Sequence, residues 1–378
     1  MIFEEFGSLV SEICLHSPLA AGRPLFWTII ANPKAGGFTI HSRWKKHHAM
    51  LTECVSRAKN NPLHKGAGPS LTARREGGNT GGMGLIPTGA AGHAGQLTCA
   101  LIEEARGASA AGGSSRPFFL IITAGGDGTS LEVMTSLYHA PPEIRECFVI
   151  LRLPMGTGND GADSWDLDKA LNLLIEPAEI QQQRALRLTT ASGKGPFLAF
   201  NILSSGLDAF VTHMTNKMKG KLPGDSYKLW VDIASVFYDR IYKVDYVDVR
   251  SRDREGNEIK AFREKLLLLA VGESGRRSYG SRKWILPDER NVCAIKQMPL
   301  LRKLALKVHM PYGTHIDEPE AILWSAQSVE FSARHPILAQ MDGETVLLEK
   351  EDYPAVIALS EPVIQILVHN RLLTKSFP

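Results

Sequence analysis

Short apolar runs followed by glycine-rich polar turns dominate the first half of the chain. Runs of strand length occupy residues 27–31, 118–122 and 148–151, and each is followed closely by a turn that contains glycine. Helical patterns, such as the one that begins at Ser130, alternate with these runs. The order strand, helix, strand through about residue 181 predicts a parallel sheet with helices on its faces.

Beyond residue 181 the apolar period shifts toward two, which predicts antiparallel sheets. Residues 304–310 and 328–332 both alternate apolar and other side chains, so each range is expected to be a strand. A helix is expected over residues 225–238, where Trp230, Ile233 and Phe237 share one face. A last strand is expected over residues 363–368.

Two segments lack a pattern that could bury apolar surface. Residues 60–85 contain seven glycines between Gly66 and Gly84, and no Phe, Tyr or Trp lies between Trp44 and Phe118. We expect a disordered surface insertion here and a smaller one over residues 107–115, because such composition does not offset the entropy of ordering.

The three polar turns carry the candidate chemistry. Residues 123–129 read Thr-Ala-Gly-Gly-Asp-Gly-Thr, residues 154–160 read Pro-Met-Gly-Thr-Gly-Asn-Asp, and residues 32–37 read Asn-Pro-Lys-Ala-Gly-Gly. Parallel strands place such turns at one edge of a sheet, where α/β proteins bind ligands. Backbone N–H groups of glycine turns and helix N-termini suit phosphate, and Asp127 suits Mg²⁺ or a hydroxyl that attacks phosphorus.

Together these motifs resemble the diacylglycerol kinase and sphingosine kinase superfamily of lipid kinases. The GGDGT and GTGND turns match that superfamily's loops closely. Further matching positions are Thr88, Gly92-His93-Ala94, Phe200-Asn201, Gly206-Leu207-Asp208-Ala209, Lys219, Gly224, Tyr227 and Asp342-Gly343-Glu344. The resemblance spans roughly Trp27 to Val368.

The resemblance implies a fold and a reaction. The expected fold is α/β, with an N-terminal doubly wound, mainly parallel sheet of the NAD kinase and diacylglycerol kinase type and a C-terminal antiparallel β-sandwich. Residues 1–181, completed by 359–378, would form the nucleotide-binding catalytic domain, and residues 182–358 a β-rich domain for the lipid substrate. The implied activity is transfer of the γ-phosphoryl group of ATP, with Mg²⁺, to the hydroxyl of diacylglycerol or a related lipid.

The site residues follow from the matching motifs. Asp127 and Glu344 are the candidate catalytic residues; Glu344 is favoured as the base, which leaves Asp127 for Mg²⁺ and phosphate, and Asp127 as the base is the alternative. Asp288 is a second candidate metal ligand. The candidate ATP-binding residues are Asn32, Pro33, Gly36, Gly125, Gly126, Gly128, Thr129, Glu132, Gly156, Thr157, Gly158 and Asn159.

Some residues depart from the pattern or have a simpler interpretation. Ala35 stands where the superfamily usually has Ser, and Arg187 stands near an acid of its V-D-L strand. We expect Asp160 to cap the next helix rather than to bind metal. The Asp342-Gly343 pair favours a hairpin turn whatever the function.

Composition adds limits on partners and on location. A net charge of +3 does not argue for nucleic acid, and five scattered cysteines indicate a reduced, cytoplasmic protein. Neither a secretory signal nor a bilayer-spanning run is recognised, so peripheral contact with the inner membrane surface is expected, and a homodimer is left open.

Two alternatives to the lipid kinase stay open. NAD kinases also carry GGDG, although the GTGND form of the second loop argues against them. A non-catalytic lipid-binding relative is the other alternative, because Ala35 and Arg187 depart from the catalytic pattern.

Overall fold

The chain folds into two compact units. The computed structural model describes residues 2–20, 25–61, 84–110, 118–156, 158–164, 166–218, 238, 242–280 and 283–369. Unit 1 consists of Met1–Gln183 together with Pro362–Pro378, and unit 2 consists of Arg184–Glu361. The expected helix at 225–238 and nearly all of the expected insertion at 60–85 lie outside the described residues.

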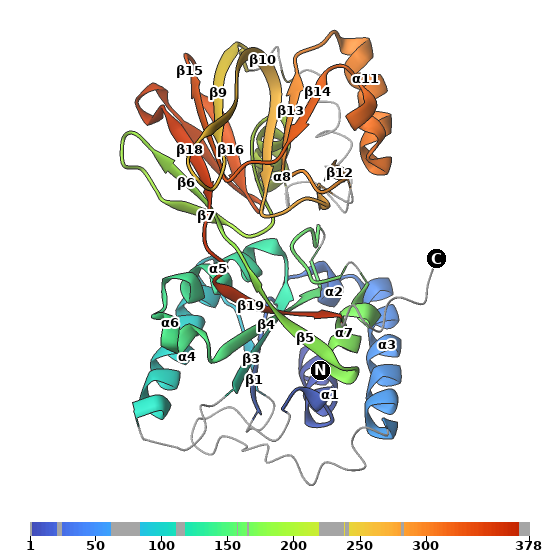
Figure 1. Cartoon of the computed structure of the whole chain (residues 1–378). Helices are drawn as coiled ribbons and strands as arrows, with labels where there is room; N and C mark the ends of the chain where they lie inside the picture. The colour runs from blue at the N-terminus through green and yellow to red at the C-terminus, as the bar shows by residue number, and fades with distance from the viewer. Residues whose placement is uncertain are drawn as a thin grey trace. The chain divides into compact units, whose positions relative to one another are not determined.

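Unit 1 is an α/β domain built on a mainly parallel sheet (Figure 1). Its helices are α1 (Ile2–Leu15), α2 (Gly36–Thr39), α3 (His41–Asn60), α4 (His93–Ala110), α5 (Asp127–His139), α6 (Pro142–Arg145) and α7 (Leu167–Ile175), with a 3-10 turn at Pro18–Ala20. Its strands are β1 (Leu25–Ala31), β2 (Leu85–Pro87), β3 (Phe118–Gly125), β4 (Phe148–Pro154), β5 (Ala178–Gln183) and β19 (Ile364–His369).

The strand order in this sheet is β2-β1-β3-β4-β19-β5. β19 comes from the end of the chain, pairs in parallel with β4 and antiparallel with β5, and so confirms the expected return of the last strand. The parallel pairing of β1, β3 and β4 brings their C-terminal ends to one edge, with Gly125 opposite Pro154. The three glycine turns follow these ends.

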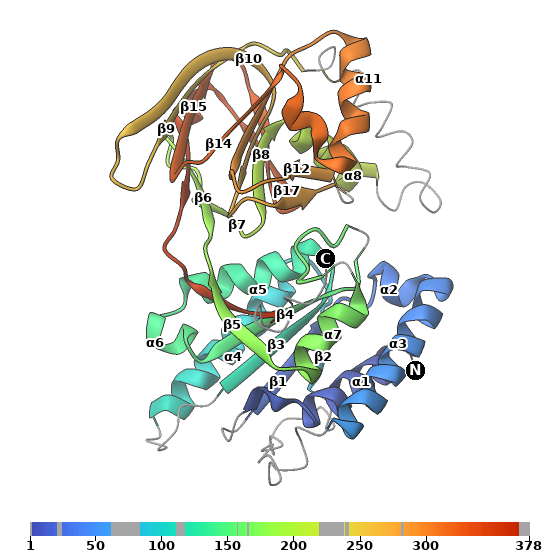
Figure 2. The same cartoon turned by 45° about the vertical axis from the view of Figure 1, so that its right-hand side comes forward.

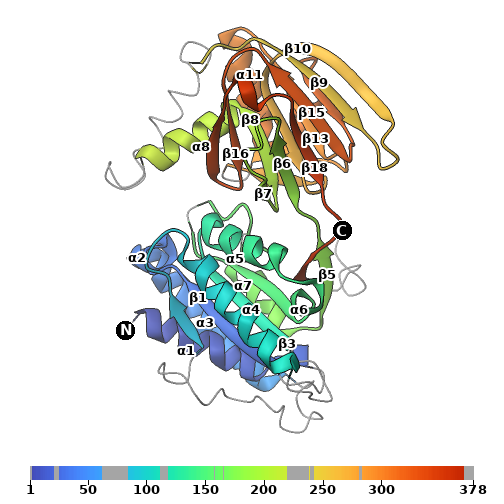
Figure 3. The ribbon, with the colours of Figure 1, turned by 90° about the vertical axis from the view of Figure 1, so that its left-hand side faces the viewer.

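Helices cover both faces of the sheet (Figure 3), and the side chains of β3 point alternately to these two faces. On one face, Leu120 and Ile122 of β3 join a buried cluster with Phe6 of α1 and Leu171 of α7. On the other face, the hydroxyl of Thr123 lies 2.8 Å from that of Ser130 in α5. β3 is buried along its whole length because both of its faces are covered.

Unit 2 is rich in antiparallel strands. The strands are β6 (Leu186–Thr190), β7 (Phe197–Ala199), β8 (Ile202–Gly206), β9 (Tyr246–Arg252), β10 (Glu258–Gly272), β11 (Arg277–Tyr279), β12 (Lys283–Leu286), β13 (Val292–Lys296), β14 (Ala321–Trp324), β15 (Ser328–Ala333), β16 (Ile337–Met341), β17 (Glu344–Leu348) and β18 (Ala355–Leu359). The helices are α8 (Leu207–Met218) and α11 (Leu300–His309), with 3-10 turns at Met310–Tyr312, Thr314–Asp317 and Lys350–Asp352.

The main sheet of unit 2 runs β17-β16-β8-β10-β9-β15-β18-β6-β7, and β13 and β14 extend from β10. β15 shows the expected alternation, because Val329 and Phe331 are buried while their neighbours are more exposed. The long strand β10 pairs with β9 in its first half and with β8 and β13 in its second half. The antiparallel architecture of the second domain is therefore confirmed.

Two expectations about local structure are wrong. Residues 304–310 do not form a strand, because Leu300–His309 is the helix α11 and its Leu, Ala, Lys and Arg residues are strong helix formers. The second expected insertion begins later than residue 107, because α4 continues through Ala110. Alternation alone misleads where composition favours a helix.

Candidate active site

The GGDGT loop joins β3 directly to α5. Gly126 is the N-cap residue of α5, its backbone is extended, and no side chain caps the helix there. A Cβ atom on Gly125 would lie 2.4 Å from the hydroxyl oxygen of Thr129, so only glycine fits beneath that side chain. The first turn of α5 therefore presents backbone N–H groups that suit a phosphate, and the helix dipole favours the same charge.

The second glycine loop touches the first. A Cβ atom on Gly156 would lie 2.6 Å from the Cα atom of Gly126 and 3.0 Å from the carbonyl oxygen of Gly125. The two loops thus pack backbone against backbone, and this close approach requires glycine at position 156. The sequence-based prediction that these turns share one sheet edge is confirmed for this pair.

Asp127 is held by the second loop. Its Oδ1 atom accepts the backbone N–H of Gly161 at 2.8 Å, and a Cβ atom on Gly158 would approach its Oδ2 atom to 3.0 Å. Burial raises the pKa of Asp127, while the N–H groups of Gly161 and Asp160 and the charge of Arg152 oppose that rise. The carboxylate is therefore fixed in direction rather than mobile.

Asn159 adopts a left-handed backbone with a φ angle of 60°. Its side-chain amide donates to the carbonyl oxygens of Pro154 at 3.3 Å and Gly156 at 3.1 Å, which closes the turn. Its Oδ1 atom is buried and accepts no hydrogen bond from the described residues. A buried acceptor of this kind suits a donor supplied by a ligand. Thr157 lies outside the described residues.

A buried ion pair closes the second loop at its base. Arg152 and Asp163 are 6% and 3% exposed, and a guanidinium nitrogen lies 2.6 Å from Oδ1 of Asp163. The other carboxylate oxygen accepts the backbone N–H of Arg152 at 2.6 Å. The pair therefore fixes both ends of the segment that presents Gly161 to Asp127.

Sequence reasoning missed this pair, although a signal was present. Arg152 is the one charged residue in the otherwise apolar run Phe148–Pro154. A charge within a buried strand needs a partner, because an unpaired buried charge is strongly unfavourable. Asp163, eleven residues later, is that partner.

The third loop is tied to the other two. Asn32 donates its backbone N–H to the carbonyl of Ala124 at 3.0 Å, and Gly37 donates to the carbonyl of Met155 at 2.8 Å. The side chain of Asn32 accepts the N–H of Lys34 and so shapes the turn. Ala35 is the buried N-cap residue of α2 and supplies no side-chain cap. A serine hydroxyl at that position would have offered one more hydrogen bond.

Two carboxylates near these loops have clear local roles. Glu132 accepts the backbone N–H groups of Gly92 at 2.7 Å and Ala94 at 3.0 Å, so it caps the N-terminus of α4 from the neighbouring helix α5. Asp166, rather than Asp160, is the N-cap residue of α7, and the expectation that Asp160 caps the next helix is wrong. The assignment of Glu132 to the nucleotide stays a prediction.

In unit 2, Asp342 and Gly343 form the tight turn of the β16–β17 hairpin, with φ angles of 45° and 104°. The Asp342 carboxylate accepts the backbone N–H groups of three successive residues, 200 to 202. The same turn leaves Glu344 exposed at the first position of β17. Asp342 therefore stabilises the turn, and Glu344 is accessible for chemistry.

A polar cluster supports this hairpin. The Ser204 hydroxyl donates to Asp208 at 2.6 Å, and the Gln340 amide donates to Asp208 at 3.3 Å. The amide oxygen of Gln340 accepts the N–H of Gly343 at 3.1 Å. Burial raises the pKa of Asp208, and the Ser204 hydrogen bond, the Lys283 charge and the Gln340 hydrogen bond oppose that rise.

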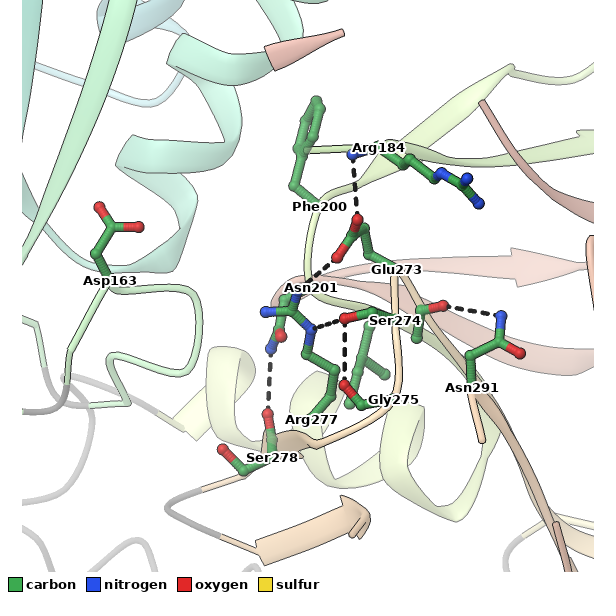
Figure 4. A network of polar contacts seen from close by, with 12 residues as sticks. Asp163, Arg184, Phe200, Asn201, Glu273, Ser274, Gly275, Arg277, Ser278 and Asn291 are labelled. Carbon is green, nitrogen blue, oxygen red and sulfur yellow. Dashed lines mark hydrogen bonds and ion pairs between the residues drawn. The ribbon is translucent and has the colours of Figure 1, made fainter. Parts of the chain in front are cut away.

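A second polar network lies around Asn201 (Figure 4). The Asn201 side chain donates to the carbonyl of Ser278 at 3.1 Å, and its own carbonyl accepts the N–H of Glu273 at 3.0 Å. Glu273 pairs with Arg277 and accepts the N–H of Arg184 at 3.2 Å. These contacts fix the chain near the start of β8.

Asp288 differs from Asp127 in what surrounds its carboxylate. Both of its oxygens accept hydrogen bonds from the guanidinium group of Arg290, and this hydrogen bonding is the main cause that lowers the pKa of Asp288. The described residues contain no group of three potential metal ligands. Mg²⁺ is commonly held by one or two carboxylates plus phosphate oxygens, which Asp127 fits better than Asp288.

This chain is similar to known proteins in the region that carries the three glycine loops. Residues 27–191 match the family model of the diacylglycerol kinase catalytic domain, a range that contains all three glycine loops. Proteins named "Probable lipid kinase YegS-like" from Yersinia pestis (strain Pestoides F) and Yersinia pseudotuberculosis serotype O:1b (strain IP 31758) are each 33% identical to this chain over 108 residues. The match covers 28% of this chain and 35% of those proteins, so the chain spans about a third of the length of the curated relatives it matches.

Solved structures share the fold over nearly the whole chain. A crystal structure described as "a putative diacylglycerol kinase" from Bacillus anthracis str. Sterne superposes with a TM-score of 0.56 at 19% identity, covering 92% of this chain and 96% of that chain. A second diacylglycerol kinase structure from the same organism gives a TM-score of 0.51 at 14% identity, covering 92% and 98%. At such identities the likeness concerns the fold.

Proposed function

Because residues 27–191 of this chain match the family model of the diacylglycerol kinase catalytic domain, we propose that the protein is an ATP-dependent lipid kinase. The observation that carries the proposal is the contact between the two glycine loops around Asp127. Gly126 and Gly156 meet backbone to backbone, and Gly161 of the second loop donates to the Asp127 carboxylate. This arrangement suits a polyphosphate and a hydroxyl acceptor.

The nucleotide phosphates would bind at the N-terminal turn of α5. Backbone N–H groups there carry no side-chain cap, and Thr129 adds a hydroxyl above Gly125. Asn159 offers its buried amide oxygen to a donor on the nucleotide. These groups are fixed by the fold before ATP binds, which is the condition for electrostatic stabilisation of a transferring phosphoryl group.

Asp127 would hold Mg²⁺, since its carboxylate is oriented by Gly161 and its second oxygen lies against Gly158. The positive charge of the metal would stabilise the negative charge of the phosphates. Asp288 is the weaker candidate because Arg290 already pairs with both of its oxygens. Asp127 of the GGDGT loop thus fits Mg²⁺ better than Asp288 of unit 2 does.

In this proposal Glu344 is the base that removes the proton from the hydroxyl of the lipid. Its carboxylate is exposed at the start of β17, and the rigid turn formed by Asp342 and Gly343 fixes its backbone. Asp342 is not available for this role, because its carboxylate already accepts three backbone N–H groups. Asp127 as the base is the competing assignment within the same function.

The acceptor is a lipid alcohol, diacylglycerol or a close relative, and the enzyme acts at the cytoplasmic surface of a membrane. No helix among the described residues combines the length and apolar character needed to cross a bilayer. In this proposal the lipid acceptor is reached at the membrane surface.

The test is a panel of acceptors incubated with the purified full chain, Mg²⁺ and γ-labelled ATP. Diacylglycerol, a sphingoid base and a polyprenol in mixed micelles are compared with NAD in solution. We expect label in one lipid and none in NAD. Labelled NADP would overturn the proposal in favour of an NAD kinase, and a folded protein that labels no acceptor would favour a non-catalytic relative.

A further inference from the structure

Side chains from two other elements of unit 2 hold the residue that precedes Glu344. The Gln340 amide oxygen accepts the backbone N–H of Gly343 at 3.1 Å, and the Asn216 amide donates to the carbonyl oxygen of Gly343 at 2.7 Å. The first contact orients the peptide group before Gly343. The second orients the peptide group that joins Gly343 to Glu344, so both peptide groups of this glycine are held.

Gly343 is the point of the hairpin turn where such contacts matter most. Its φ angle is 104°, a region that glycine enters freely, and a Cβ atom there would meet nothing within 4 Å. Open space at that position places no packing restriction on the glycine. An Asp-Gly pair already favours a two-residue hairpin turn, so the two amide contacts select one orientation of a turn that forms without them.

Helix α8 supplies the Asn216 contact and a second one beside it, and this helix lies next to the β16–β17 hairpin (Figure 2). Asn216 stands near the end of α8, and one turn earlier the Nδ1 atom of His213 lies 3.4 Å from the hydroxyl oxygen of Thr345. Residues three apart share one face of a helix. One face of α8 therefore contacts both sequence neighbours of Glu344, which are Gly343 and Thr345.

Gln340 is itself fixed, so its contact with the turn is rigid. It is buried, and its amide group donates to the Ser204 hydroxyl at 2.9 Å and to the Asp208 carboxylate at 3.3 Å. Asp208 lies in the first turn of α8. The two ends of α8 thus act on the same glycine, one through Gln340 and the other through Asn216.

We propose that Asn216 and Gln340 are positioning residues that hold Glu344 in the orientation needed to remove a proton from the acceptor hydroxyl. The inference rests on the proposed function, in which Glu344 is the base. Glu344 is exposed at the first position of β17, so the direction of its side chain depends on the orientation of its backbone. A general base contributes roughly 10² to 10⁴ to a rate only within hydrogen-bond reach of its proton, and misplacement by about 1 Å can cost roughly 10²-fold.

The variant Asn216→Leu tests this role, because it removes the amide donor and keeps a side chain of similar size. Asn216 is exposed, and leucine is a better helix former than asparagine, so α8 should not lose stability. We expect a Tm within a few degrees of the wild type and an unchanged KM for ATP. The kcat for lipid phosphorylation should fall roughly tenfold, because the base is misplaced. A purely structural role would lower Tm and leave kcat of the folded protein unchanged.

Two further variants serve as controls. Asn216→Gln keeps an amide donor on a longer side chain and should restore most of the wild-type kcat. Asn257→Leu makes the same exchange in the β9–β10 hairpin of the same unit, where the Asn257 amide donates to Asp253 at 3.1 Å, and it should leave kcat unchanged. Equal kcat values for Asn216→Leu and Asn257→Leu would overturn the proposal.

The double variant Asn216→Leu, Glu344→Gln shows whether Asn216 acts through Glu344. If it does, adding Asn216→Leu to Glu344→Gln should change the residual transfer from labelled ATP by less than about twofold. A further tenfold fall would mean that Asn216 affects transfer by another route, which would also overturn the proposal.

The same assays separate this inference from the function on which it rests. If the wild type labels a lipid and Glu344→Gln labels it equally well, the positioning role falls and the lipid kinase function stands. If the folded wild type labels no acceptor, the proposed function falls and the positioning role falls with it.

Discussion

Gly161 donates its backbone N–H to the carboxylate of Asp127 across 2.8 Å, and this contact joins the two glycine loops. The residues stand 34 positions apart, one at the start of α5 and the other beyond the GTGND turn. The contact aligns an otherwise mobile carboxylate before any ligand binds. Alignment in advance is what an electrostatic contribution to phosphoryl transfer requires.

Asp127→Asn keeps the shape of the side chain and its ability to accept from Gly161, but it removes the charge. We expect kcat for lipid phosphorylation to fall by roughly 10² or more, as for other single electrostatic groups in active sites. Steady-state kinetics with a folded variant measures this. The matched control is Asp166→Asn, because Asp166 lies in the same segment and caps α7. Similar kcat values for both variants would remove Asp127 from the mechanism.

Arg152→Met should destabilise unit 1, because it leaves the buried carboxylate of Asp163 without its cation. We expect a loss of about 3–5 kcal/mol in the free energy of unfolding, measured by urea denaturation. The double variant Arg152→Met, Asp163→Asn removes both charges and keeps an oxygen that can accept the backbone N–H of residue 152. The double variant should regain at least half of the free energy of unfolding that Arg152→Met loses. If it regains none, the unpaired carboxylate of Asp163 is not the cause of the loss.

The variant Glu132→Ala tests whether Glu132 only caps helix α4 or also binds the nucleotide. The cap on Gly92 and Ala94 would be lost, so we expect the free energy of unfolding to fall by about 1 kcal/mol. The KM for ATP should change little if capping is the whole role. An increased KM at unchanged stability would instead place Glu132 in the nucleotide site.

The raised pKa of Asp208 predicts that the stability of the folded protein depends on pH. Burial raises its pKa in the folded protein above the ordinary 3.8, so the folded state holds a proton in a pH range where the unfolded chain has released it. Stability contributed by this group therefore falls as pH rises from about 3.8 through the raised pKa. Asp208→Asn has no such proton.

The measurement for Asp208 is the urea midpoint of the wild type and Asp208→Asn at several pH values. The variant should gain stability relative to the wild type as pH rises through this window, and the two should converge at the acidic end. A difference that does not change with pH would show that Asp208 titrates alike in both states.

Much of unit 1 follows from the sequence, because its strands are short apolar runs that end in glycine turns. Neighbouring parallel strands fix the relative place of their C-terminal ends, so GGDGT and GTGND could be assigned to one edge. The hairpin at Asp342-Gly343 followed from turn chemistry alone. Each of these features depends on local backbone preference.

Features that depend on distant partners did not follow. Residues 304–310 alternate as a strand would, yet residues 304–309 belong to the helix α11, which Arg302 and Leu306 hold in place. The partner of Arg152 could not be chosen from sequence, because many carboxylates stand within reach along the chain. Likewise, only the structure shows that Glu132 caps α4, because Gly92, whose N–H it accepts, lies 40 positions earlier in the chain.

The most direct test of the account follows the phosphorus of ATP. Purified protein is incubated with Mg²⁺, diacylglycerol in mixed micelles, and ATP labelled at either the γ or the α phosphorus, and the lipid is then extracted. We predict label in the lipid only from γ-labelled ATP, and its loss in Asp127→Asn. Lipid that carries α label, or no lipid label from a folded protein across the acceptor panel, would contradict the central claim.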